Sequence, residues 1–104
     1  MVTVTVPKTR PKTKTRAKPE RPRLYKVILL NDEFTPQDFV VKVLKGVFRM
    51  SVDEAYGVML TAHQKGACVV AVFTKEVAEA KANLGTEEGA RAGYPLPFTT
   101  EREE

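Results

Sequence analysis

The chain has 104 residues, of which 17 are Lys or Arg, 13 are Asp or Glu, one is His and one is Cys. This length suits one domain of ordinary size and excludes a multidomain enzyme. A single Cys can form neither an intrachain disulfide nor a cysteine-based zinc cluster, which fits a reducing compartment and makes the cytoplasm the expected location. The longest apolar run, Ala67 to Phe73, has seven residues, whereas roughly 20 are needed to span a bilayer.

The positive charge is concentrated in the first 23 residues. They contain eight basic residues, one acidic residue and four of the seven prolines, while residues 24–104 contain nine basic and twelve acidic residues, a net charge of −3. A segment with so few apolar residues cannot bury enough surface to offset the entropy lost on ordering. We therefore predict a disordered basic extension over 1–23 and a folded core over 24–104. The prolines argue against an organelle transit peptide, because they interrupt the amphipathic helix it would need.

The first half of the core contains signals for one strand and two helices. An apolar strand is predicted over 25–30, and a helix follows from Thr35-Pro36 to about Phe48, with Thr35 as its cap. Ser51-Val52-Asp53-Glu54 is a capping box and begins a second helix, which Gly66 is placed to end. The inner face of this second helix is expected to consist of Val52, Ala55, Tyr56, Met59 and His63, with Leu60 and Ala62 on its flanks.

The second half is predicted to add a strand, a helix and a short edge strand. Residues 67–73 are apolar on both faces, so we expect this strand to be central. The third helix is expected from Lys75 to about Leu84, with Thr74 as its cap, Gly85 at its end and a loop over 86–94. An edge strand over 97–100 completes the order β-α-α-β-α-β. The economical arrangement is a small α+β sandwich with three helices on one face of a three-stranded antiparallel sheet.

The sequence offers little support for catalysis. It contains no metal-ligand spacing, nucleophile elbow or phosphate-binding loop, and no cofactor is expected. His63 and Cys68 are the only base and thiol available, and a thiol inside an apolar strand is usually inert.

A binding hollow is the alternative that the polar residues suggest. Met59 and His63 are four residues apart and share a helix face. If the Asn31-Asp32 loop lies against that face, a carboxylate, an amide oxygen and an imidazole nitrogen would surround an apolar hollow and would suit an ammonium group attached to a large apolar side chain. Spacing alone favours a purely structural explanation, since Asn-Asp is a common turn pair and a His at a helix end more often favours the helix dipole or caps carbonyls.

A longer pattern carries a resemblance to a known family. Its first block is Tyr25-Lys26-Val27-Ile28-Leu29-Leu30-Asn31-Asp32-Glu33-Phe34-Thr35-Pro36, followed by Phe39-Val40 and Val43-Leu44. Its later blocks are Met59-Leu60, His63 with Gly66, Val72-Phe73-Thr74, Glu76-Val77-Ala78-Glu79, Lys81 and Pro95-Leu96. Over about residues 24–101 the chain resembles ClpS, the adaptor of the ATP-dependent Clp protease.

The resemblance implies an adaptor rather than an enzyme. ClpS proteins bind substrates whose first residue is Leu, Phe, Tyr or Trp (N-degrons), deliver them to the Clp unfoldase ClpA or ClpC, and so modulate substrate choice. It implies that Asn31, Asp32 and His63 bind the substrate α-amino group. The remaining substrate-binding positions that it implies are Glu33, Thr35, Gln37, Val40, Met59, Ala62 and Leu96.

Several positions qualify this resemblance. Glu33 replaces the more usual Asp at the rim. Gln37 stands where Met is frequent near the pocket mouth, a position that helps discriminate against β-branched first residues. Ala62 stands where the larger Val is common, so we expect a larger pocket that tolerates Trp. Glu76 and Lys81 match positions that face the N-terminal domain of the unfoldase, although both are also ordinary helix charges.

The basic extension would correspond to the family's flexible N-terminal segment, which the unfoldase engages, and a monomer is expected. The rival hypothesis is a small nucleic-acid or ribosome-associated protein that uses this extension. The net negative charge of the core argues against it.

Overall fold

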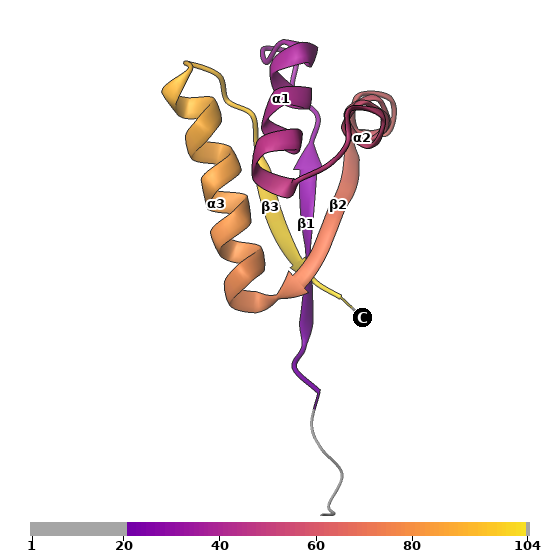
Figure 1. Ribbon diagram of the computed structural model, residues 1–104, viewed down its shortest axis with the longest axis vertical. Helices are drawn as coiled ribbons and strands as arrows, with labels where there is room; N and C mark the ends of the chain where they lie inside the picture. Colours follow the sequence, from indigo (N-terminus) through magenta and orange to yellow (C-terminus); the bar gives the residue numbers. More distant parts are fainter. Residues whose placement is uncertain (1–20, 104) are drawn as a thin grey trace, which may run out of the picture.

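The computed structural model describes residues 21–103, so the predicted basic extension lies outside the described residues up to position 20. The elements are β1 (Leu24–Leu30), α1 (Gln37–Phe48), α2 (Val52–Lys65), β2 (Ala67–Thr74), α3 (Lys75–Arg91) and β3 (Phe98–Arg102). Their order confirms the predicted α+β arrangement. Figure 1 shows α1 and α3 in front of the sheet and α2 beside the start of β2.

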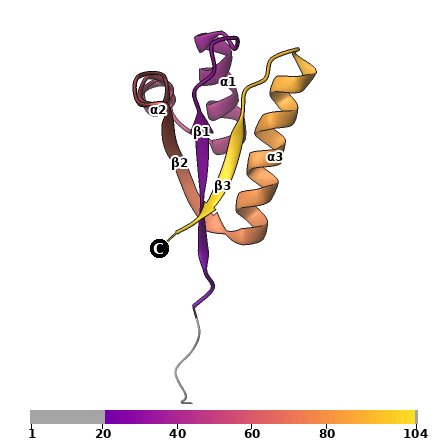
Figure 2. The same cartoon turned by 180° about the vertical axis from the view of Figure 1, so that it is seen from behind.

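The sheet is antiparallel with the strand order β2-β1-β3, so the prediction that 67–73 is central was wrong. The central strand is β1. The register pairs Val69 with Ile28 and Val72 with Lys26. Lys26 and Ile28 alternate along β1 with the buried Val27 and Leu29, so they belong to the other face of the sheet, which no helix covers in Figure 2. Val69 and Val72 are 46% and 38% exposed. Apolar residues on both faces of β2 therefore do not indicate burial between two layers.

The first helix contributes much of the core. Val40, Val43, Leu44 and Val47 are its buried residues and lie at helical spacing. The helix begins at Gln37 with Pro36 at the cap position and no side-chain hydrogen bond there. The prediction of Thr35 as the cap was therefore wrong, because its hydroxyl bonds elsewhere, as described below.

The second helix confirms both predicted ends. Ser51 Oγ accepts a hydrogen bond from Glu54 N at 3.1 Å, Glu54 Oε1 accepts one from Ser51 N at 2.9 Å, and Gly66 ends the helix with φ 93°. The inner face is narrower than predicted. Its buried residues are Ala55, Met59 and Ala62. Val52, Tyr56 and His63 are exposed, because α2 lies at the side of the sheet and not over its middle (Figure 1).

The third helix is longer than predicted. It continues through Gly85 to Arg91, so the loop predicted over 86–94 is confined to 92–97. A Cβ atom on Gly85 would lie 2.7 Å from the ring of Phe98, and one on Gly89 would lie 2.7 Å from Leu96 Cβ. Both glycines are thus required by close packing of α3 against the segment that leads into β3. They do not end the helix.

The last strand is confirmed as an edge strand, paired only with β1 and slightly longer than predicted. Within residues 21–103, no helix is long and apolar enough to cross a membrane.

Candidate functional site

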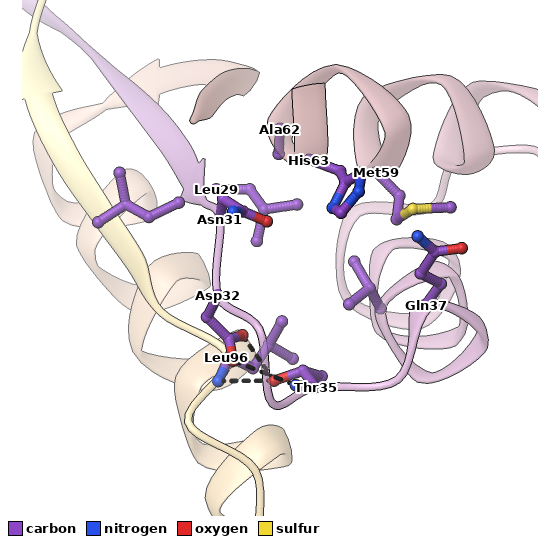
Figure 3. Close-up of a pocket in the computed structure, with 11 residues that line it drawn as sticks. Leu29, Asn31, Asp32, Thr35, Gln37, Met59, Ala62, His63 and Leu96 are labelled. Atoms are coloured by element: carbon purple, nitrogen blue, oxygen red, sulfur yellow. Dashed lines mark hydrogen bonds between the residues drawn. The ribbon is translucent and has the colours of Figure 1, made fainter. Parts of the chain in front are cut away.

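A small hollow lies where the end of β1, the β1–α1 loop, α1, α2 and the α3–β3 loop meet (Figure 3). It is lined by Leu29, Leu30, Asn31, Asp32, Thr35, Gln37, Val40, Met59, Ala62, His63 and Leu96. All the predicted substrate-binding residues except Glu33 are therefore brought together. Glu33 is exposed and accepts a hydrogen bond from Asn31 Nδ2 at 3.3 Å. The sequence analysis missed Leu29 and Leu30, whose position directly before Asn31 was the available signal.

The Asp32 carboxylate organises the β1–α1 loop. Its Oδ1 accepts hydrogen bonds from the backbone N–H groups of Phe34 at 2.7 Å and Thr35 at 3.1 Å, and its Oδ2 accepts one from the Thr35 hydroxyl at 2.7 Å. A carboxylate offers about four lone-pair positions. The loop thus occupies three of them and holds the group rigidly, while Oδ2 retains capacity for one further donor at the hollow.

One hydroxyl connects two loops that are distant in sequence. Thr35 is the only buried polar side chain among the described residues. Its Oγ1 donates to Asp32 and accepts from the backbone N–H of Leu96 at 3.2 Å, as the dashed lines in Figure 3 show. Leu96 has φ 22°, a backbone conformation that costs a non-glycine residue about 1–3 kcal/mol and that clusters at functional sites.

Asn31 and His63 lie on opposite sides of the mouth of the hollow (Figure 3). Asn31 is fixed by its backbone N–H, which donates to the Gly66 carbonyl at 2.9 Å. His63 is exposed on the last turn of α2. Asp32, Asn31 and His63 all line the hollow. A carboxylate oxygen, an amide oxygen and an unprotonated imidazole nitrogen can each accept a hydrogen bond, a set that suits a cation with several N–H donors.

The floor of the hollow is apolar and buried. Val40, Met59, Ala62 and Leu96 are at most 7% exposed. The volume of the hollow is about 30 Å³, while a cavity that holds benzene measures about 150 Å³. A large side chain therefore enters only if lining residues move. Met59 is flexible by nature, and a second hollow, lined in part by Gln37, Tyr56 and Met59, provides space into which it can turn.

The two predicted partner-binding residues lie on α3. Glu76 is exposed in its first turn. Lys81 is half-buried, and its Nζ donates a hydrogen bond to the backbone carbonyl of Val47 at 2.9 Å. This carbonyl lies in the last turn of α1, where carbonyl groups lack an N–H partner within the helix. Five residues of helix separate the two by about 140°. Lys81 thus has a structural contact that the sequence analysis did not predict.

The catalytic alternative gains no support. Cys68 is half-buried and lines a different groove, between α2 and β2, whereas His63 lines the hollow. Burial raises the pKa of the Cys68 thiol above its ordinary value, and the Thr61 side chain lowers it by less. Less thiolate is then present at neutral pH, which reduces nucleophilicity. Among residues 21–103, no group of three or more His, Cys, Asp or Glu could hold a metal ion.

An apolar hollow with a fixed carboxylate and two further acceptors in its lining defines the class of small α+β proteins with a pocket suited to an amine that bears an apolar group. The comparisons with known proteins agree with this class. The model of the family "ATP-dependent Clp protease adaptor protein ClpS" matches residues 20–99, and the chain belongs to this family.

Two relatives and one solved structure illustrate the similarity. ATP-dependent Clp protease adapter protein ClpS 2 of Mesorhizobium japonicum is 62% identical over 96 residues, which cover 92% of this chain and 95% of the relative. ClpS 1 of Bradyrhizobium diazoefficiens has the same identity and coverage. The structure of Agrobacterium tumefaciens ClpS2 bound to L-phenylalaninamide has a TM-score of 0.79 and 57% identity, and it covers 80% of this chain and 100% of that one.

Proposed function

We propose that this chain is an adaptor that binds polypeptides beginning with Leu, Phe, Tyr or Trp and delivers them to the Clp unfoldase and protease. The observation that carries the proposal is the hollow itself, in which the Asp32 carboxylate is fixed beside an apolar wall. The bound ligand of the Agrobacterium relative, L-phenylalaninamide, combines an α-amino group with a large apolar side chain, the two features that this hollow suits.

The two parts of the site would act together. The substrate ammonium group would donate to Asp32 Oδ2, the Asn31 amide oxygen and a neutral nitrogen of His63, while the first side chain enters between Met59 and Leu96. Burying a large apolar side chain contributes roughly 1.5–3 kcal/mol, and loss of one partner of a desolvated charged pair costs roughly 2–5 kcal/mol. A micromolar dissociation constant, on the order of −8 kcal/mol, suits delivery rather than retention.

The finer features of this function belong to the same proposal. The partner would be the N-terminal domain of ClpA or ClpC, contacted through exposed Glu76 and the remaining donors of Lys81. The chain would work as a cytoplasmic monomer, without catalysis of its own, and the unfoldase would engage the basic extension.

The test is fluorescence anisotropy with three labelled peptides that differ only at the start. One begins with free Phe, one with N-acetylated Phe and one with free Ser. We expect micromolar binding of the free Phe peptide alone. Binding that is equal for all three, or absent for all, would contradict the proposal.

Two variants test whether the peptide binds in the hollow. Asp32→Asn keeps the size of the side chain but removes its charge, and His63→Ala removes the imidazole. Each should weaken binding of the Phe peptide by about tenfold or more. Asp53→Asn is the matched control, because Asp53 is an exposed acidic residue of α2 outside the hollow, and it should bind like the unaltered chain. If this control loses as much binding as Asp32→Asn, the overall charge of the chain and not the hollow determines the affinity.

A further inference from the structure

Leu96 lies between the hollow and the third helix, and no other residue of the α3–β3 loop lines the hollow. It is fully buried. On the side away from the hollow it lies against Gly89, where a Cβ atom would be 2.7 Å from Leu96 Cβ and 3.3 Å from its Cδ2. The helix therefore leaves no space for even one methyl group behind this wall residue.

The position of Leu96 is determined from both sides. Its backbone N–H is held by the Thr35 hydroxyl, and its φ of 22° is a strained value that only surrounding contacts maintain. The following residue is also fixed, because the Pro97 carbonyl accepts a hydrogen bond from Leu30 N at 3.1 Å. A group that pushed on Leu96 Cβ would move a backbone-linked atom, which no side-chain rotation can relieve.

We propose that Gly89 is a positioning residue that sets the depth of the hollow, and hence the largest first residue that the chain accepts. The inference rests on the proposed function and deepens it. Because Gly89 has no side chain, Leu96 sits back against α3. Since the volume of the hollow is only about 30 Å³, a displacement of this wall toward the hollow would exclude large side chains before smaller ones.

The chain provides a matched control one helical turn earlier. Gly85 is also buried in α3, and a Cβ atom there would lie 2.7 Å from two ring atoms of Phe98. Phe98 does not line the hollow. Gly85→Ala and Gly89→Ala thus introduce the same atom into the same helix, with the same gain in helix propensity and the same closest approach, but only in the second does the new atom press on a residue that lines the hollow.

The experiment measures dissociation constants of peptides beginning with free Leu, Phe and Trp for the full chain and both variants, with thermal unfolding recorded for each. We expect Gly89→Ala to weaken Trp binding about tenfold relative to Leu binding, as overpacking of a close-fitting site predicts. We expect Gly85→Ala to leave the Trp-to-Leu ratio unchanged, whatever its effect on the unfolding temperature. Equal changes for all three peptides, or equal ratios in the two variants, would overturn the inference.

A second variant keeps the test decisive if Gly89→Ala does not fold. Leu96→Ala shortens the wall from the other direction and should shift the Trp-to-Leu ratio in favour of Trp, while an unchanged ratio would overturn the inference. Failure of the unaltered chain to bind any of the three peptides would instead contradict the proposed function. The two failures are therefore distinguishable.

Discussion

At the scale of single residues, Thr35 illustrates how one buried hydroxyl supports a binding site without being its chemical centre. The hydroxyl donates to Asp32 and accepts from Leu96 N, so it fixes both the charged and the apolar side of the hollow. The sequence suggested a helix cap for this residue, which is a local role. The structure shows a contact across 61 positions of sequence.

We predict that Thr35→Val, which keeps the shape of the side chain, lowers the free energy of unfolding by about 1–3 kcal/mol, because the Leu96 N–H is left buried without an acceptor. Binding of a peptide beginning with Phe should weaken as well, since Asp32 and Leu96 both lose a fixed partner. Urea unfolding and fluorescence anisotropy measure the two effects.

Thr35→Ser is the control for this prediction, because it removes only a methyl group and keeps the hydroxyl. It should bind the Phe peptide nearly as well as the unaltered chain. If Ser and Val have the same effect, the methyl group matters and the hydrogen bonds do not.

At the scale of secondary-structure elements, the two best-defined helix starts differ in how they are capped. Ser51 forms the complete capping box with Glu54, whereas Thr74 has the backbone angles of a cap but no side-chain hydrogen bond. Ser51→Ala should therefore cost about 0.5–2 kcal/mol of stability. Thr74→Ala should change the free energy of unfolding very little, which chemical denaturation can measure. A larger loss at Thr74 than at Ser51 would contradict this assignment of the caps.

The helices and strands show which features a sequence encodes locally. The capping box and the Gly66 cap depend on neighbouring residues and were predicted correctly. Gly85 was misinterpreted as a helix end, because its role depends on Phe98 beyond the next loop. The central position of β1 was missed for a related reason, since strand order is a property of the whole sheet and β2 keeps apolar residues on an open face.

In the candidate site, too, some features follow from the local sequence and others depend on the fold. The helical spacing of Met59 and His63 predicted one side of the hollow, and the proximity of Asn31-Asp32 remained conditional on the fold. Leu96 entered only through the resemblance to ClpS, because nothing in its local sequence indicates that its backbone N–H meets the Thr35 hydroxyl at the hollow. The structural contact of Lys81 with Val47 could not be predicted, since it joins two helices whose relative placement is tertiary.

At the scale of the whole molecule, the central strand separates the hollow from the point where the chain enters the core. The hollow lies at the Leu30 end of β1, whereas the chain enters β1 at Leu24. Six steps of about 3.3 Å place these ends about 20 Å apart. The residues before β1 therefore join the core at the end remote from the hollow, and they contribute none of the described lining residues.

We predict that deleting residues 1–20 leaves binding of a Phe-initiated peptide unchanged within about twofold, but abolishes degradation of a Phe-initiated protein by the Clp protease. The core keeps every lining residue, whereas the segment proposed to be engaged by the unfoldase is lost. Anisotropy and a degradation assay with purified unfoldase and protease measure the two outcomes.

The deletion also removes six basic residues and one acidic residue, so the formal net charge falls by five, from +4 to −1. A chain that carries the same 20 residues in shuffled order keeps this charge and length. If an unstructured segment of sufficient length is what the unfoldase engages, the shuffled chain should restore degradation, because pulling on a segment requires length and disorder and no particular order of residues. If a chain with Gly-Ser repeats of equal length fails where the shuffled chain succeeds, attraction of the basic residues to an acidic surface is also required.

Weaker peptide binding after the deletion would contradict the separation of the two ends of β1, since it would mean that the extension reaches the hollow.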